Sequence, residues 1–331
     1  MADIKDKIID ALNALVKRDT AEKKFFQVRA YKKVIEELKA LGKPIVRLEN
    51  IDGIPGIGKK IREKIEEILA TGELRAAERA KENLSLDALE VLSGVYGIGP
   101  TKAAELIASG IKTIAQLRSA LEKDPSLLNR SQKIGLKYYD DIIQRIPRAE
   151  MKKHERKLIN ELYVGQEGSV VGSFRRGQES SGDIDFLIKM DFSPGSDQKE
   201  IFQEYINDLK ESGYMIEVLS QGDQKCLAVV RLGPDSPARR LDILVIPSNQ
   251  FPYALLYFTG SGDFNVAFRK HALKLGYTLN EHEMKLTGKV PDAKPVPAMT
   301  SEADIFAFLG LKYKEPSERV TGAVELKATR V

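Results

Sequence analysis

The spacing of apolar residues changes near Ile146-Pro147, and this change divides the chain into two kinds of structure. Before it, apolar side chains recur at the spacing of amphipathic helices, and runs of β-branched residues are scarce. After it, short runs rich in valine, isoleucine and leucine predict strands. We therefore expect an all-α region followed by a region built on a sheet, which makes an α+β chain of several domains.

The helical region is predicted to contain helices joined by short glycine turns. A helix over 57–71 stops at Gly72, a residue type that often ends helices. Further helices are expected over 31–41, 101–109 and 114–121.

The second region is predicted to be a mixed α/β domain on one sheet. A helix over 199–212 separates its second strand from its third, and 233–237 has the composition of a loop between strands. A helix over 265–275 and a compact mixed segment follow. The expected strands cover 169–172, 184–188, 215–219, 227–230 and 241–246.

Cysteine and histidine are too rare for several classes of site. Cys226 is the only cysteine, and the histidines are His154, His271 and His282, which excludes a disulfide framework, a zinc finger and a histidine-rich hydrolase site. No apolar run approaches the roughly 18 residues that span a bilayer, so no membrane partner is expected. With 52 basic and 48 acidic residues, the net charge of +4 is weak evidence for a polyanionic partner.

A glycine motif occurs twice, at 53–58 and 94–99, each time before a predicted helix and followed by lysine. Glycine lets phosphate approach the free backbone N–H groups at the start of a helix. The two copies resemble helix-hairpin-helix modules, which hold the DNA backbone without reading its sequence. The alternative is two tight turns between helices, with glycine needed for steric reasons.

Lys60 and Lys64 are four residues apart and share one face of the helix that follows the first copy. A lysine whose pKa is lowered by neighbouring cations becomes a nucleophile that forms a Schiff base with an aldehyde. From the residues alone, a solvated basic face is the simpler interpretation.

Three aspartates in the second region form the strongest chemical signal. Asp183 and Asp185 are two apart, so in a strand their side chains point to one face. Asp242 interrupts an otherwise apolar strand, and if the two strands are neighbours the three carboxylates converge. Such a cluster binds hard cations, above all Mg²⁺ completed by substrate phosphates. The alternative is a capping aspartate with acids at strand edges.

The sequence Gly172-Ser-Phe-Arg-Arg-Gly177 with Asp183-Ile-Asp185 resembles the palm signature of nucleotidyltransferases. More specifically, the chain is similar to the X-family DNA polymerases, most closely the beta type. Motifs at 54–58, 97–100, 146–148, 239–242, 257–261, 269–273 and 312–316 extend the resemblance over nearly the whole chain. The resemblance implies a lyase-like helical domain at 1–82, a helical DNA-binding subdomain at 83–146, a catalytic palm at 147–248 and an α/β subdomain for the nascent base pair at 249–331.

The resemblance also implies residue roles in a template-directed, gap-filling polymerase of base excision repair. Asp183, Asp185 and Asp242 would bind two Mg²⁺ ions, for which Mn²⁺ can substitute, and Arg240 would support Asp242. The turn at 259–261 would contain a cis peptide bond. The residues implied in binding the incoming nucleotide and the template are Arg148, Ser173, Arg176, Gly182, Tyr257, Phe258, Gly260, Asn265 and Arg269.

A second activity implied by the resemblance is 5′-deoxyribose phosphate lyase chemistry, with Lys64 as the Schiff-base lysine and Tyr31 and Lys60 in its pocket. The chain departs from the family pattern at Phe26, Gln27 and Ala76, where groups that bind the 5′ phosphate are expected. Weaker phosphate capture follows from these replacements.

In the family, hairpin carbonyls can hold Na⁺ or K⁺ against phosphate; here they would belong to Asp52, Ile54, Ile57, Ser93, Val95 and Ile98.

The expected partners are gapped or nicked duplex DNA and deoxynucleoside triphosphates, bound by a monomer. Two other functions stay open, a template-independent terminal transferase and a non-catalytic protein that binds DNA ends. The compartment also stays open between a nucleus and a viral or prokaryotic cytoplasm, since no clear basic localisation cluster occurs.

Overall fold

The computed structural model describes residues 3–81, 84–190, 198–290 and 293–322. The expected domain boundary at 82/83 and the end of the last domain therefore lie outside the described residues. The chain forms two compact units, Met1–Tyr139 and Asp140–Val331. No helix in the described ranges is both long and apolar enough to cross a membrane.

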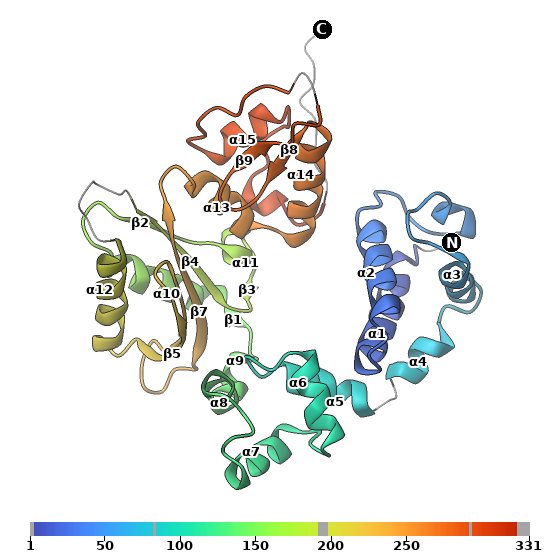
Figure 1. The fold of residues 1–331 in the computed structure, drawn as a ribbon, viewed down its shortest axis with the longest axis horizontal. Coiled ribbons are helices and arrows are strands. Elements are labelled where there is room, and N and C mark those ends of the chain that lie inside the picture. Colours follow the sequence, from blue (N-terminus) through green and yellow to red (C-terminus); the bar gives the residue numbers. More distant parts are fainter. Residues whose placement is uncertain (1–2, 82–83, 191–197, 291–292, 323–331) are drawn as a thin grey trace. The chain divides into compact units, whose positions relative to one another are not determined.

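The N-terminal unit is helical, as predicted (Figure 1). Its core is built by the apolar faces of the first three long helices, with Leu12, Val34 and Ile65 fully buried. The third of these helices ends at Gly72, whose φ of +80° is the left-handed conformation that glycine adopts readily. Its elements are α1 Lys5–Ala21, α2 Phe25–Lys39, η1 Leu48–Ile51, α3 Lys59–Thr71, α4 Arg75–Lys81, α5 Leu84–Ser93, α6 Pro100–Ala108, α7 Ile114–Lys123 and α8 Arg130–Lys137.

The short helix α9 (Tyr139–Ile142) spans the boundary between the units, and the second unit contains a five-stranded sheet of order β2-β4-β7-β6-β5. Strands β4 and β7 are parallel, and the other pairs are antiparallel, so the predicted mixed sheet is confirmed. A separate short pair, β1 and β3, joins the start of this unit to the segment before β4. The strands are β1 Ile146–Pro147, β2 Glu167–Val170, β3 Ser180–Ser181, β4 Ile184–Met190, β5 Met215–Gln221, β6 Lys225–Val230 and β7 Arg239–Pro247.

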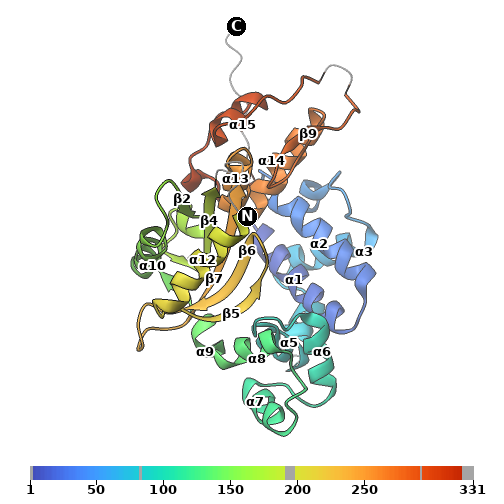
Figure 2. The same ribbon diagram turned by 60° about the vertical axis from the view of Figure 1, so that its left-hand side comes forward.

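The two faces of the sheet differ in what covers them. Helices α10 (Arg148–Asn160) and α12 (Gln198–Glu211) pack on one face, where Phe186 and Ile243 are fully buried (Figures 1 and 2). On the other face, α13 (Phe251–Thr259) covers Leu187 and Ile246 near the carboxyl ends of β4 and β7. Asp185 on β4 and Asp242 on β7 point to the same face as Leu187 and Ile246, because side chains alternate along each strand.

The C-terminal part of the unit has its own core of aromatic rings. Phe264 and Phe268 from α14 (Gly262–Lys274) pack against Phe306 from α15 (Glu302–Phe308). A two-stranded sheet, β8 (Tyr277–Leu279) with β9 (Met284–Leu286), lies beside α14, and the 3-10 turn η2 (Pro316–Glu318) follows α15.

An ionic network links this part to the region of the five-stranded sheet through α11 (Gly172–Arg175). Nη1 and Nη2 of Arg175 donate to Glu302, at 3.0 and 2.8 Å, and Arg319 donates to the same carboxylate at 2.6 Å. Arg319 is fully buried, and its guanidinium lies against the rings of Phe264 and Phe306. Burial opposes ionisation of Glu302, yet these hydrogen bonds hold its pKa below the usual value.

Replacing Arg319 with methionine is expected to destabilise the C-terminal part by about 3 kcal/mol, because it removes one partner of a buried ion pair. Urea unfolding followed by tyrosine fluorescence measures this loss. Exchanging the exposed Lys274, at the end of α14, for methionine is the matched control and should change stability by less than about 0.5 kcal/mol. Equal effects of the two changes would contradict the structural role of Arg319.

A buried histidine makes stability depend on pH. His154 on α10 is fully buried, and its Nδ1 lies 2.7 Å from the Tyr214 hydroxyl. Burial lowers its pKa from 6.5 to about 4, although the nearby carboxylate of Glu150 opposes this. The folded protein therefore excludes a proton that the unfolded chain binds.

The contribution of neutral His154 to the free energy of unfolding is complete above pH 6.5 and is lost as the pH falls through about 4. We expect a loss of about 3 kcal/mol over that range, at 1.4 kcal/mol per pKa unit. Urea unfolding at several pH values checks it, with the His154→Gln variant as reference. If the variant keeps the full pH slope, another group is responsible.

Candidate active site and nucleic-acid interface

Two carboxylates lie side by side on neighbouring strands. Asp185 on β4 pairs in register with Asp242 on β7, so the predicted adjacency of these strands is confirmed. The pKa of Asp185 is raised to about 6, mainly by burial and secondly by the charge of Asp242. Burial also raises the pKa of Asp242. Oδ1 of Asp242 is buried without a hydrogen-bond partner in the described part of the chain. Two half-buried acids that repel each other attract a cation.

The third acid is bound differently. Asp183 precedes β4 and forms an ion pair with Arg240, whose Nε lies 3.7 Å from Oδ1 of Asp242. Among the described residues, no three His, Cys, Asp or Glu side chains form a group that could hold a metal ion. The expected convergence of three carboxylates is therefore only partly observed, because an arginine binds one of them.

The donor set of the pair nevertheless fits a hard divalent cation, since carboxylate oxygens are the ligands that Mg²⁺ prefers. Gly172 borders the pair with a φ of +60°, and a Cβ there would lie 2.7 Å from Oδ2 of Asp185. Only glycine leaves this oxygen accessible. Lys225 on β6, which is exposed, partly opposes the rise in the pKa of both aspartates.

The turn around α11 is fixed by its own side chains. The Ser173 hydroxyl donates to the buried Ser181 hydroxyl at 2.9 Å. Arg176 donates to the Thr259 carbonyl at 2.6 Å, and its Nη1 would lie 3.2 Å from a Cβ at Gly260. The Gly260–Ser261 peptide bond is cis, as the family resemblance implies.

Sequence reasoning missed Arg145. In the β1–β3 pair Ile146 lies opposite Ser181, so the preceding residue falls opposite Gly182. The guanidinium of Arg145 donates to the Ser180 carbonyl at 2.5 Å, and it would lie 3.7 Å from a Cβ at Gly182. The only sequence signal for Arg145 was its position directly before the short extended segment Ile146-Pro147.

Arg148, the arginine expected to contact the triphosphate, is engaged with the turn itself. Its Nη1 donates to the carbonyls of Phe174 and Gln178, at 2.8 and 3.2 Å, and its guanidinium lies over the Phe174 ring. These contacts hold the turn of α11 in position.

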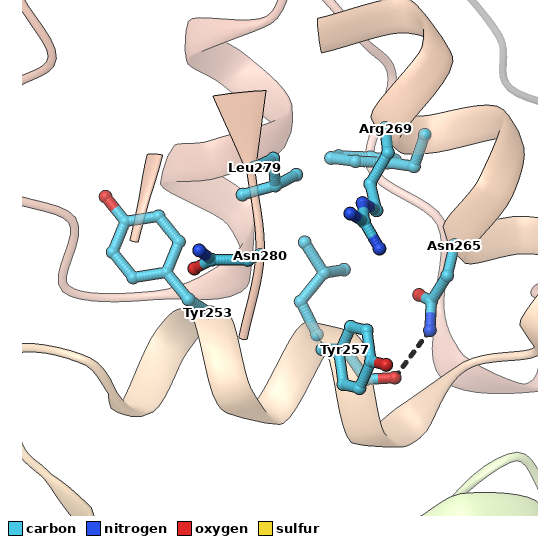
Figure 3. A pocket seen from close by; sticks show the side chains of 8 residues that line it. Tyr253, Tyr257, Asn265, Arg269, Leu279 and Asn280 are labelled. Carbon is cyan, nitrogen blue, oxygen red and sulfur yellow. Dashed lines mark hydrogen bonds between the residues drawn. The ribbon is translucent and has the colours of Figure 1, made fainter. Parts of the chain in front are cut away.

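A pocket opens between α13, α14 and β8 (Figure 3). The Asn265 amide donates to the Tyr257 carbonyl at 2.7 Å, and Arg269 extends from α14 above it. Tyr257 and Phe258 meet edge to face, with ring centroids 5.1 Å apart. Asn280, which sequence reasoning did not single out, also lines the pocket.

The two glycine motifs form the same hairpin. In each, the last glycine is the N-cap of the next helix, with ψ near 175° at Gly58 (176°) and Gly99 (173°). The turn bonds also correspond, because Ile57 N donates to the Ile54 carbonyl and Ile98 N donates to the Val95 carbonyl. The carbonyls considered for a monovalent cation, those of Asp52, Ile54, Ile57, Ser93, Val95 and Ile98, belong to these two hairpins.

Lys64 lies half-buried on α3, and its ammonium is 3.4 Å from the Lys60 carbonyl. Glu67, one turn further along, is engaged instead by Arg75. Tyr31 is buried, and burial, followed by the charge of Asp19, raises its pKa. The structure brings Lys60 and Lys64 together on one helix, whereas Tyr31 belongs to the core beneath.

The three residues that depart from the family pattern for binding the 5′ phosphate differ in exposure. Phe26 has an exposed fraction of 83%, Gln27 is exposed, and Ala76 is partly buried against the core.

Family models match four consecutive parts of the chain. They are described as a helix-hairpin-helix domain at 4–74, the fingers domain of DNA polymerase lambda at 90–143, the DNA polymerase beta palm at 145–248 and the DNA polymerase beta thumb at 254–320. The pairing of a helical N-terminal part with a mixed palm sheet confirms the predicted fold class.

The chain is also similar to individual proteins. It is 34% identical to DNA polymerase lambda of Rattus norvegicus, over 94% of this chain and 56% of the relative. It is 28% identical to DNA polymerase lambda of Arabidopsis thaliana, over 88% of this chain and 57% of that relative. The chain thus spans little more than half the length of these relatives.

Proposed function

Because this chain belongs to the X-family DNA polymerases, we propose that it adds deoxynucleotides to a primer across short DNA gaps under direction of the template, as base excision repair requires. The observation that carries the proposal is the in-register pair Asp185 and Asp242, whose half-buried, repelling carboxylates favour a divalent cation. A non-catalytic DNA-end binder would have no need for such a pair.

Asp185 and Asp242 would hold Mg²⁺, joined by Asp183 once its carboxylate leaves Arg240. When bound, two Mg²⁺ ions would supply Lewis-acid stabilisation of the attacking and departing oxygens. Asp242 would accept the proton of the primer 3′-hydroxyl or orient it for removal. Arg240 would then neutralise Asp242, from which its Nε is 3.7 Å away.

The triphosphate would lie along the turn of α11. The Ser173 hydroxyl, the Arg176 guanidinium and the amide of Gly182 would bind its oxygens, with Arg145 as an additional cation beside Gly182. Arg148 would act as a positioning residue, since its bonds to two turn carbonyls support the turn from behind.

The sugar and base would lie against the residues that surround the pocket of Figure 3. Tyr257 and Phe258, with the turn at Gly260, would crowd the 2′ position and disfavour ribonucleotides. Asn265 would contact the minor-groove edge of the base, and Arg269 would reach the template strand.

Changing Arg145 to alanine is expected to raise the KM for the incoming nucleotide about tenfold, because a charge-assisted bond to phosphate contributes about 1.5 kcal/mol. Single-nucleotide kinetics on a gapped duplex measure it. The exposed Arg47 offers a control, since Arg47→Ala should leave the KM unchanged. A KM for Arg145→Ala that equals the wild-type value would remove this residue from the nucleotide site.

The two hairpins would grip the DNA backbone through their free N–H groups, and their carbonyls would bind Na⁺ or K⁺ against phosphate. Such contacts release counterions, so DNA binding should weaken steeply with salt.

Lys64 would supply lyase activity. Its amine would attack the aldehyde carbon of an abasic sugar and lose water to form an imine. Loss of a C2′ proton and cleavage of the C3′–O bond would then release the DNA end that carries the 5′ phosphate, and water would hydrolyse the imine to free Lys64. The exposed Phe26 and Gln27 offer no cation for that phosphate, so its capture would depend on Lys60.

Primer extension on a one-nucleotide gap, with each of the four template bases in turn, tests the proposal. Incorporation that follows the template base supports it. Incorporation that ignores the template indicates a terminal transferase, which is disfavoured by the short connection of residues 231–238 between β6 and β7. No incorporation with intact DNA binding indicates a non-catalytic protein.

A further inference from the structure

Helices α10 and α12 lie side by side on the face of the sheet opposite to the paired aspartates (Figures 1 and 2). The Tyr205 hydroxyl of α12 donates to the Leu158 carbonyl of α10 at 2.9 Å. The Tyr163 hydroxyl, just after α10, donates to Asp208 of α12 at 2.5 Å. The outer surfaces of these two helices have no role in the proposed nucleotide site.

The outer surface of α10 is positively charged. Lys153 and Arg156 are exposed and lie one helical turn apart, and Lys152 is exposed beside them. Neither Lys153 nor Arg156 has an ion-pair partner among the described residues, whereas Lys157 is paired with Glu161 at 2.6 Å. Lys152, Lys153 and Arg156 are called the basic face below.

The outer surface of α12 carries the opposite charge. Acidic residues recur there every three or four positions and so form one stripe along the helix, called the acidic stripe below: Glu200, Glu204, Asp208 and Glu211. Like charges at this spacing repel each other, so the stripe favours an arrangement in which cations face it.

An exposed apolar group lies at the end of α10. Ile159 and Tyr163 have exposed fractions of 42% and 37%, and Val164 is fully exposed. The pKa of Tyr163 is raised by burial, then by its hydrogen bond to Asp208 and by the charges of Asp208 and Glu204, which places the acidic stripe beside this group. Apolar side chains with charges around them are the composition of a protein interface.

We propose that this surface pairs with the same surface of a second copy of the chain. In a dimer whose two-fold axis runs between the helices, the basic face of each copy lies opposite the acidic stripe of the other. The apolar group of each copy then adds to the contact. Charge complementarity selects this occupant, because an acidic peptide would match the basic face alone. The pairing leaves the opposite face of each sheet, with its paired aspartates, uncovered.

Sedimentation velocity of the full chain over a range of concentrations, at low and high salt, tests the pairing. The wild type should form dimers that dissociate as the salt concentration rises, because salt screens the charges. One variant, Lys153→Glu with Arg156→Glu, reverses the basic face, and another, Glu204→Lys with Glu211→Lys, reverses the acidic stripe. Each variant alone should have a dimer Kd at least about tenfold above the wild-type value, since like charges then face each other.

An equimolar mixture of the two variants should dimerise nearly as well as the wild type. In the mixed dimer, the reversed face of one copy meets the reversed stripe of the other, and the second face and stripe are unchanged. Such a rescue also shows that both variants are folded.

The apolar group is tested separately. Val164→Glu should weaken the dimer, because it places a charge among apolar side chains. Leu286→Glu is the matched control, since Leu286 is 45% exposed on β9, outside the proposed interface, and it should dimerise as the wild type does. Equal losses in Val164→Glu and Leu286→Glu would count against the inference.

A wild-type chain that stays monomeric at every concentration would overturn the inference. Reversal variants that dimerise normally, or a mixture that stays monomeric, would overturn it as well. If reversing the basic face weakens DNA binding and leaves dimers intact, phosphate binds there and the inference is wrong. Sedimentation requires no activity, so a failure of the proposed function, seen as absent primer extension, is distinguishable from a failure of the pairing.

Discussion

Asp242→Ala is expected to lower nucleotide incorporation by roughly a thousandfold, because it removes several kcal/mol of charge stabilisation in the transition state and each 1.4 kcal/mol is a factor of ten. DNA binding should stay within about twofold, since phosphate contacts elsewhere provide most of the affinity. Single-turnover extension of a one-nucleotide gap measures the first quantity, and fluorescence anisotropy of labelled DNA measures the second.

The same variant should be no less stable than the wild type in the absence of metal. Asp242 is half-buried next to Asp185, and its removal relieves a repulsion that raises the pKa of Asp185. Asp235→Ala, at an exposed loop position of the same region, is the matched control and should keep full activity. If Asp242→Ala still extends primers at a wild-type rate, the catalytic assignment of this pair is wrong.

Lys64→Ala is expected to abolish covalent trapping on an incised abasic site, because borohydride can only reduce an imine that has formed. Lys64→Arg should fail as well, since a guanidinium keeps the charge but is not a nucleophile at neutral pH. Gel separation of the protein–DNA adduct after reduction gives a direct readout. Gap filling by both variants should remain near the wild-type rate, because Lys64 and the aspartates belong to separate units.

Lys59→Ala is the control for this experiment. Lys59 is exposed at the first position of α3, so it provides similar charge without the half-buried setting of Lys64. It should retain trapping. An adduct that persists in Lys64→Ala at full yield would show that another amine attacks the sugar.

Much of the fold could be predicted because it depends on local patterns. The helix end at Gly72, the strands that carry Asp185 and Asp242, and the repeated hairpins all follow from apolar spacing and glycine. That β4 and β7 are neighbours could not be predicted from the sequence, because the order of strands depends on the whole sheet and not on any local pattern.

Side-chain partners far apart in sequence could not be predicted. Asp183 lies just outside the paired strand, so alternation does not fix its direction, and the structure joins it to Arg240. The positions of Arg145 and Arg148 show the same limit. Arg145 precedes α10 and Arg148 is its first residue. Only the pairing of β1 with β3 shows that Arg145 is the one beside Gly182.

The burial of Arg319 is a further example. An arginine near the end of a charged segment is usually solvent-exposed, yet this one lies among aromatic rings and binds Glu302. The contact spans 17 residues and needs α15 and the following turn to be in place, so no local pattern signals it.

The most direct test of the central claim is the stoichiometry of Mn²⁺, measured by electron paramagnetic resonance on the protein with gapped DNA and a non-hydrolysable nucleotide. Asp185 and Asp242 are expected to support two bound ions per complex in the wild type, and fewer in Asp242→Ala and Asp185→Asn. Identical Mn²⁺ binding in the wild type and both variants would contradict the claim that these paired carboxylates form the metal site.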